Sequence, residues 1–300
     1  MQADTSSQPS LASRLALCNE VIAQTSPGMS IALRQQDFRR QCELAAGLGY
    51  TALEVAPFTW ADDPLTLDGD AVAEYARIAS GCGIAICGLH WLLVSPAGLS
   101  LVDADAAVRA RTASALVRLV EIAADAGASY LVHGSPKQRS VPAGMAPEIA
   151  RAHAHAALVP ATRRAAELGL RYCIEPLARA ETDFLNTVAD AAEFAAAFDN
   201  PACMTMIDCS AAGRTEREPV PALIRRWLPT GCIGHVQLND PNRKAPGQGE
   251  MDFGPVLQAL HETGYDGWVA VEPFDYDPDG PGCAAYAASY LRGLFPLIKE

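Results

Sequence analysis

The sequence has no surplus of basic residues and no long apolar run. Its 300 residues include 23 Lys and Arg against 35 Asp and Glu, so the formal net charge is −12. Proteins that bind nucleic acid or anionic membranes need Lys and Arg gathered on one face, and a membrane-spanning helix needs roughly 20 consecutive apolar residues. We therefore expect no nucleic-acid partner and no membrane partner, whereas a small uncharged ligand would meet no such penalty.

The cysteines lack the spacing of a disulfide framework or of a structural zinc site. There are nine, an odd number, scattered along the chain without any CxxC pair, which is typical of a protein from a reducing compartment. We therefore expect a cytoplasmic protein. The first ten residues also lack the basic and apolar regions of a secretory signal, and we expect residues 1–12 to form a disordered tail before one domain over 13–300.

A linker and a low-complexity segment are absent as well. With 50% hydrophobic and 19% charged residues and a mean hydropathy of +0.07, the composition is that of a globular protein. Instead of a linker, short apolar runs bounded by Gly, Asp or Pro alternate eight times with helical patterns. The runs predict strands over residues 15–18, 50–55, 84–90, 130–133, 171–175, 204–208, 232–238 and 268–272.

The helical period is clearest over residues 103–126, where Leu116, Leu119 and Ile122 belong to one apolar stripe and Gly127 follows the last turn. Further along, Thr187 lies three residues before Asp190, which resembles a capping box ahead of an Ala-rich helix over 191–198. Eight alternations without a break favour a single (β/α)8 TIM barrel over a doubly wound sheet or two domains.

Polar side chains stand at the ends of four consecutive predicted strands. The active site of such a barrel lies at the carboxyl ends of its strands. Three converging carboxylates would repel one another, whereas a divalent cation with oxygen ligands removes that cost and makes Mg²⁺ or Mn²⁺ the natural occupant. Any one of these residues alone is more often a salt-bridge partner, but four at a spacing of one β/α unit predict a metal site formed by Glu175, Asp208, Gln237 and Glu272.

Other polar residues end the second, third and fourth predicted strands. Glu54, His90 with Trp91, and His133 should face the same mouth of the barrel. A substrate-binding role is one interpretation for His90, Trp91 and His133, and Trp91 could stack on a sugar ring. A buried histidine that bonds a backbone carbonyl is the other interpretation, and the sequence leaves both open.

The stretch GHVQLNDPNRKAPGQGEMDF over residues 234–253 carries a family resemblance. From the fourth strand to the carboxyl terminus, the chain resembles the sugar phosphate isomerase/epimerase family of xylose isomerase-like TIM barrels, which includes D-tagatose and D-psicose 3-epimerases and hydroxypyruvate isomerase. The resemblance implies that Gln237 takes the third metal position and that His235 is a neighbouring substrate-binding residue. It also implies that Glu181 and Arg243 contact substrate. One departure is Ala211, because the epimerases carry a substrate-contacting histidine there.

The resemblance implies a divalent-metal-dependent isomerase or epimerase that acts on a ketose or a small α-hydroxycarbonyl through an enediolate. Glu175 and Glu272 would then be the acid/base pair, Mn²⁺ or Mg²⁺ the cofactor, and a homodimer or homotetramer the assembly. The same site could run β-elimination on a keto-sugar or an inosose, as a lyase. A DNA-repair enzyme like an AP endonuclease is disfavoured by the acidic balance and the lack of a His-rich zinc set, and a non-catalytic sugar-binding role is a further alternative.

Overall fold

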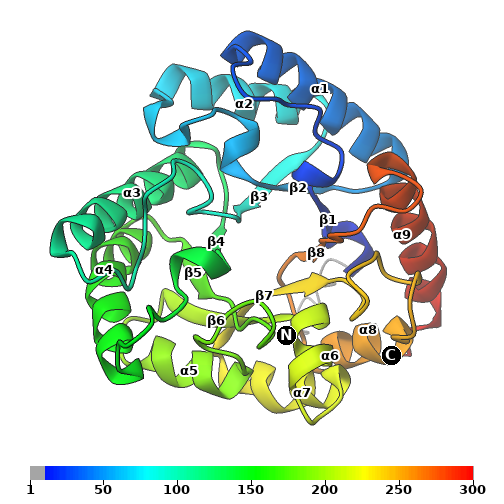
Figure 1. Ribbon diagram of the computed structural model, residues 1–300. Helices are drawn as coiled ribbons and strands as arrows, with labels where there is room; N and C mark the ends of the chain where they lie inside the picture. The colour runs from blue at the N-terminus through cyan, green and yellow to red at the C-terminus, as the bar shows by residue number, and fades with distance from the viewer. Residues whose placement is uncertain (1–10, 300) are drawn as a thin grey trace, which may run out of the picture.

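The computed structural model describes residues 11–299 and shows a closed barrel of eight parallel strands in sequence order. Figure 1 looks along the barrel. The last strand pairs with the first, Val269 lying opposite Leu15, so the sheet has no free edge. The strands are β1 (Leu15–Cys18), β2 (Ala52–Val55), β3 (Ala85–Leu89), β4 (Tyr130–His133), β5 (Arg171–Ile174), β6 (Cys203–Asp208), β7 (Ile233–Leu238) and β8 (Val269–Val271).

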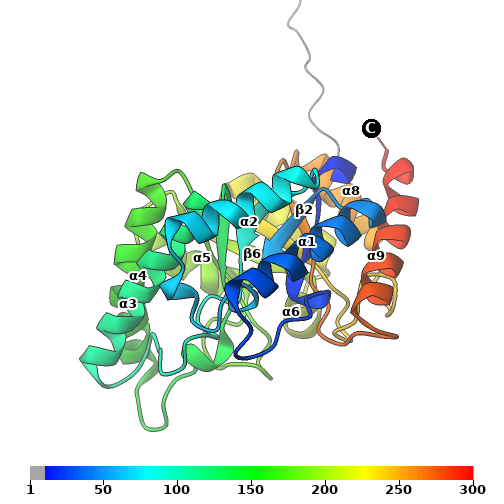
Figure 2. The ribbon, with the colours of Figure 1, turned by 90° about the horizontal axis from the view of Figure 1, so that it is seen from above.

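The helices form a ring outside the barrel, and the loops that follow the strands gather at one end of it (Figure 2). Two helices, instead of one, separate β6 from β7. None of the helices within residues 11–299 is both long and apolar enough to cross a membrane. They are α1 (Ile31–Leu48), α2 (Gly69–Gly81), α3 (Ala106–Asp125), α4 (Pro147–Glu167), α5 (Val188–Ala196), α6 (Cys209–Thr215), α7 (Val220–Trp227), α8 (Phe253–Glu262) and α9 (Gly280–Leu294).

The single (β/α)8 barrel predicted from the sequence is confirmed, and the strand positions agree to within about two residues. Several observed strands stop one residue before the polar residue that the prediction included: β8 ends at Val271, although the Glu272 backbone N–H still donates to the Leu238 carbonyl of β7. The expected tail over 1–12 lies mostly outside the described residues. Leu11 and Ala12 belong to a short 3-10 helix, η1 (Leu11–Arg14), in which Leu11 is buried.

Burial explains why these segments form strands and helices. The residues of β1, β2, β4, β7 and β8 are buried throughout, as expected of parallel strands covered on both faces. The stripe predicted on α3 also faces the core, since Leu116, Leu119 and Ile122 have no exposed surface. A continuous apolar core thus fixes the strands, and their carboxyl ends and the loops that follow lie at one end of the barrel.

The cap of α5 gives a testable stability change. The hydroxyl of Thr187 accepts a hydrogen bond from the Asp190 backbone N–H at 3.1 Å, so this part of the predicted capping box is present. Replacing an N-cap threonine with alanine costs about 1 kcal/mol. Thr187→Ala should therefore lower the free energy of unfolding by about that amount in urea denaturation. Thr187→Ser retains the hydroxyl and should stay near the parent; equal losses in both variants would contradict the role of the cap.

Candidate metal and catalytic site

Three carboxylates meet at the carboxyl ends of the strands. Glu175 follows β5, Asp208 is the last residue of β6, and Glu272 follows β8. One oxygen of each lies within 4.8 Å of the others, and all three residues are buried. The structure thus brings together three residues that are far apart in sequence, as the strand-end pattern predicted.

Burial and mutual repulsion make the ionised form of this cluster costly. The pKa of Glu175 is raised well above its ordinary value by burial first and then by the charges of Glu272 and Asp208. Burial also raises the pKa of Asp208 to about 6, and it raises the pKa of Glu272 to about 8 although His90 opposes the shift. Protons or a cation must therefore compensate the three charges, and a divalent ion suits a set of oxygen donors.

Gln237 contributes an amide to the same region from the strand next to Asp208. Its Nε2 donates to Oε1 of Glu54 at 2.7 Å, while its Oε1 is buried without a hydrogen-bond partner among residues 11–299. Burial raises the pKa of Glu54, but His235, His90 and Tyr130 outweigh this and lower it to about 2. Because an ionised carboxylate only accepts hydrogen bonds, Glu54 fixes the amide with its nitrogen toward the carboxylate. The free amide oxygen fits a fourth ligand position for Mg²⁺ or Mn²⁺.

Two histidines singled out in the sequence, His235 within β7 and His133 at the end of β4, are not among the residues that line the cavity described below. His235 is fully buried, with its Nε2 2.8 Å from Oε2 of Glu54 and its ring stacked on Tyr130 at 4.2 Å. His133 places its Nδ1 2.7 Å from the Tyr172 hydroxyl, and burial lowers its pKa to about 3. Glu54, too, has no exposed surface. These side chains support the floor of the site.

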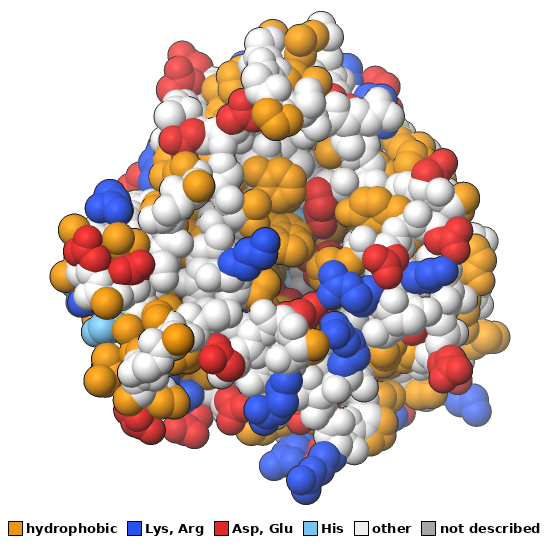
Figure 3. All heavy atoms as spheres, in the orientation of Figure 1, with side chains coloured by type: hydrophobic (Ala, Val, Ile, Leu, Met, Phe, Trp, Pro, Cys, Tyr) orange, Lys and Arg blue, Asp and Glu red, His pale blue; other side chains and the backbone are white. Residues whose placement is uncertain are grey.

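A cavity of about 200 Å³ opens above the carboxylates. Figure 3, in the orientation of Figure 1, shows a hollow near the centre of the molecule, with acidic and basic side chains around it. A groove of about 970 Å³ between the loops before α7 and α8 is larger but holds none of the three clustered carboxylates. The cavity is lined by six residues predicted from the sequence, Glu175, Glu181, Glu272, Arg243, His90 and Trp91, and by Gly134, Ser135, Pro136, Lys137, Leu177 and Phe274, which were not predicted.

One wall of the cavity joins the loops after β5, β7 and β8. The guanidinium of Arg243 donates through Nη1 to Oε1 of Glu181 at 2.5 Å and lies 4.4 Å from the centre of the Phe274 ring. The Arg243 carbonyl accepts hydrogen bonds from the backbone N–H groups of Phe274 and Asp275. These contacts hold Glu181 and Arg243 in place at the wall.

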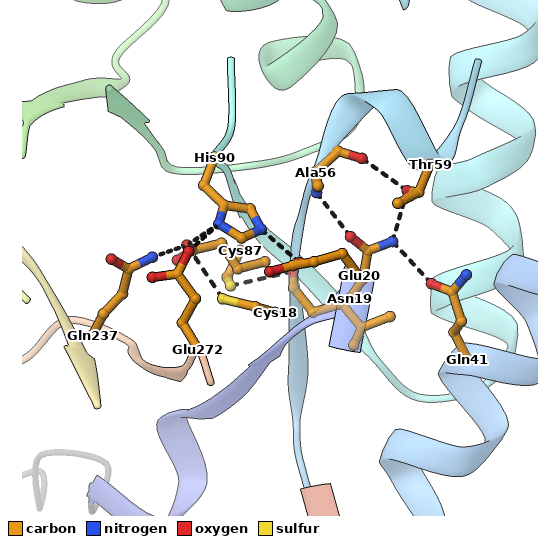
Figure 4. Close-up of polar contacts among 12 residues, drawn as sticks. Cys18, Asn19, Glu20, Gln41, Ala56, Thr59, Cys87, His90, Gln237 and Glu272 are labelled. Carbon is orange, nitrogen blue, oxygen red and sulfur yellow. Dashed lines mark hydrogen bonds and ion pairs between the residues drawn. The ribbon is translucent and has the colours of Figure 1, made fainter. Parts of the chain in front are cut away.

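His90 lies between two acidic residues, as Figure 4 shows. Its Nδ1 is 3.0 Å from Oε1 of Glu272, and its Nε2 is 2.9 Å from Oε2 of Glu20. Burial alone would lower the pKa of His90, but Glu20, Glu272 and Glu54 raise it well above the ordinary value. Glu20, just after β1, was not predicted, although its place beyond a strand end could have indicated it.

Asn239 connects the Asp208 carboxylate to the backbone of Glu272 and was also missed. Its Nδ2 donates to Oδ2 of Asp208 at 2.6 Å and to the Glu272 carbonyl at 3.0 Å, and its Oδ1 accepts from the Ser210 N–H at 2.7 Å. This amide orients the Asp208 carboxylate and ties it to the backbone of Glu272, as residues that support metal ligands commonly do.

The fold and the site define a (β/α)8 barrel with a cavity over buried carboxylates at the carboxyl ends of its strands, where barrel enzymes carry their active sites. The chain belongs to the family described as Xylose isomerase-like TIM barrel, whose family model matches residues 42–294.

Individual relatives match parts of the sequence. The D-psicose 3-epimerase of Ruminiclostridium cellulolyticum is 30% identical over 106 residues, which cover 35% of each chain. The ketose 3-epimerase of Arthrobacter globiformis is 27% identical over 191 residues, 61% of this chain and 64% of the relative. The match to the D-psicose 3-epimerase therefore spans about a third (35%) of the length of that relative. A solved L-ribulose 3-epimerase covers 95% of both chains with a TM-score of 0.79 at 20% identity, a likeness of fold.

A divalent ion should stabilise this protein through the carboxylate cluster. At a hundredfold excess over its dissociation constant, a ligand specific for the folded state adds about 2.7 kcal/mol. Mn²⁺ or Mg²⁺ added after chelation should therefore raise Tm, and Asp208→Asn should weaken the effect by removing one negative charge from the cluster. Asp125→Asn, on the exposed end of α3, should respond like the parent. An unchanged Tm with both ions would exclude a folded-state site for them.

Gly134 makes room for the Glu175 carboxylate. A Cβ at this position would collide with Oε2 of Glu175, so Gly134→Ala should displace the carboxylate. We expect Mn²⁺ affinity to fall by about 10–100-fold in isothermal titration, the loss typical of disturbed ligand support. Gly81→Ala is the matched control, because among residues 11–299 no heavy atom beyond its chain neighbours and its own helix backbone lies within 4 Å of the added methyl group. Unchanged affinity in Gly134→Ala would show that the position of Glu175 does not matter for the ion.

Proposed function

We propose that this protein is a divalent-metal-dependent isomerase or epimerase of a ketose or a small α-hydroxycarbonyl. The observation that carries the proposal is the meeting of three buried carboxylates with raised pKa values, Glu175, Asp208 and Glu272, beneath a small cavity. A carbon acid next to a carbonyl loses its proton only with a positioned base and with stabilisation of the charge that develops on oxygen. The site offers residues for both tasks.

The residues that would hold the metal ion are Glu175, Asp208, Gln237 and Glu272. All four offer oxygen, and the set contains three carboxylates and one amide, which favours Mn²⁺ or Mg²⁺ over softer ions. When bound, such an ion supplies Lewis-acid stabilisation of negative charge on substrate oxygen. Glu54 orients the Gln237 amide by accepting from its Nε2, and Asn239 orients Asp208.

The proton would be carried by the carboxylates that flank the cavity. Glu175 and Glu272 both line it and come from different sides of the barrel, β5 and β8. Burial raises the pKa of both glutamates, that of Glu272 to about 8, so each holds a proton more readily than an exposed glutamate, which suits residues that both take and return a proton. Burial excludes bulk water, which protects the enediolate from side reactions.

The walls of the cavity suit a small polyhydroxylated substrate. Glu181 and Arg243 present polar groups that can bind hydroxyls, and Trp91 and Phe274 present apolar rings for the carbon skeleton. At about 200 Å³ the cavity is smaller than the roughly 300–1,000 Å³ of sites for drug-sized ligands. The names of the matching relatives, D-psicose 3-epimerase and ketose 3-epimerase, support sugar chemistry of this kind.

Hydrogen exchange in D₂O tests this function. Mn²⁺-loaded protein should introduce solvent deuterium next to the carbonyl of at least one member of a panel of ketoses and hydroxypyruvate, observed by NMR. Replacing Glu175 with glutamine removes a basic oxygen at constant size, so exchange should fall by about 10²–10⁴-fold, the usual contribution of a positioned base. The exposed Glu193→Gln is the control. If no carbon acid in the panel exchanges, the proposed function is wrong.

A further inference from the structure

The two proposed acid/base residues are held very differently. Oε1 of Glu272 lies 3.0 Å from Nδ1 of His90, and its Oε2 is buried without a partner among residues 11–299. For the carboxylate of Glu175, no side-chain hydrogen bond or ion pair is found within the same residues; only its backbone N–H donates, to the His133 carbonyl. One glutamate therefore has a polar contact at one oxygen, and the other, which packs against Gly134, has no such contact among these residues.

His90 is in turn fixed from its far side. Its Nε2 lies 2.9 Å from Oε2 of Glu20, so carboxylates face both ring nitrogens (Figure 4). Because carboxylates accept hydrogen bonds, this arrangement is satisfied when both nitrogens donate. Contacts at both ring nitrogens hold the ring, and through it Oε1 of Glu272.

A buried amide fixes the backbone turn that carries Glu20. Asn19 has no exposed surface, and its Nδ2 donates to Gln41 at 2.9 Å and to Thr59 at 2.8 Å. Its Oδ1 accepts from the Ala56 N–H at 2.8 Å. Both the nitrogen and the oxygen of this amide are thus hydrogen-bonded, which fixes the backbone next to Glu20.

We propose that Glu20 and His90 are positioning residues that hold Glu272 stationary, so that Glu175 alone moves the substrate proton and the reaction is isomerisation between adjacent carbons. This inference rests on the proposed function. A carboxylate that binds the metal ion through one oxygen needs its second oxygen to act as a base. Among residues 11–299 the second oxygen of Glu175 has no hydrogen-bond partner, whereas that of Glu272 lies 3.0 Å from Nδ1 of His90.

A single base accounts for isomerisation with balanced atoms. Glu175 takes the proton from the carbinol carbon, the C–H electron pair forms the enediolate double bond, and the carbonyl π pair moves to the carbonyl oxygen. Protonated Glu175 then returns the proton to the former carbonyl carbon while one proton passes from the carbinol oxygen to the other oxygen. Inversion at one carbon would require a second acid on the opposite face, which a restrained Glu272 does not supply.

Deuterium bound to substrate carbon distinguishes isomerisation between adjacent carbons from epimerisation at C3. The Mn²⁺-loaded protein is given D-erythrulose and D-fructose deuterated at C1, and hydroxypyruvate deuterated at C3. We expect part of the deuterium on the neighbouring carbon, with the configuration at C3 of the ketoses unchanged. Inversion at C3 as the main reaction would overturn this inference and leave the proposed function intact. Absence of both transfer and exchange would refute the proposed function and this inference together.

Variants of Glu20 and His90 test whether these two residues determine the choice between isomerisation and epimerisation. His90→Phe removes the donor to Glu272, and the ratio of C3 epimer to isomer should rise at least about tenfold, the effect of losing a hydrogen bond to a charged group. Glu20→Gln keeps a partner for the ring but removes its charge, so the ratio should shift less in the same direction, and Glu20→Asp should restore it. His155→Phe, on α4 outside the cavity lining, is the control. Uniformly slower variants with the parental ratio would indicate a merely structural role.

A readout independent of turnover is the crystal structure of the Mn²⁺-loaded protein. The arrangement requires that Glu272 meets the ion through Oε2 only and that the contact between Oε1 and His90 persists. A structure in which both oxygens of Glu272 bind the ion, or in which Oε1 turns away from His90, would overturn the inference whatever the activity.

Discussion

The central constraint in this protein is the enforced closeness of three negative charges inside a barrel. Carboxylates that approach within 4.8 Å in a buried place repel one another strongly unless protons or a cation compensate them. The barrel can impose this closeness because its closed sheet and apolar core fix the strand ends rigidly. Folding free energy from the core therefore offsets the electrostatic cost of the site.

Residues next to the proposed metal ligands set the orientation of the ligand side chains. Asn239 connects Asp208 to the residue that follows β8, and Glu54 sets the direction of the Gln237 amide. Gly134 leaves the space that the Glu175 carboxylate fills. Each of these groups acts on a ligand atom of the proposed metal site from outside it, so the orientation of the donors is decided by residues that need not touch substrate.

The sequence allowed the fold and the clustered carboxylates to be predicted, because strand alternation sets both the topology and the shared end at which Glu175, Asp208 and Glu272 lie. It could not show Lys137 or Phe274, which reach the cavity from loops whose paths depend on tertiary contacts. The sequence also could not distinguish a residue that lines the cavity from one that is buried beneath it. His90 and His133 both end or follow neighbouring strands, yet only His90 lines the cavity, while His133 bonds Tyr172 below it.

The contact of His90 with both Glu20 and Glu272 has a consequence for how the molecule is made. Glu20 follows the first strand and Glu272 the last, and these strands are neighbours only because β1 pairs with β8. Chains are synthesised from the amino terminus, and early segments can collapse before late ones exist. The ring of His90 can be held on both sides only after β8 has left the ribosome and closed the sheet. Assembly of the acidic centre is thus coupled to the final step of chain closure, and a truncated chain would carry its charges without the means to organise them.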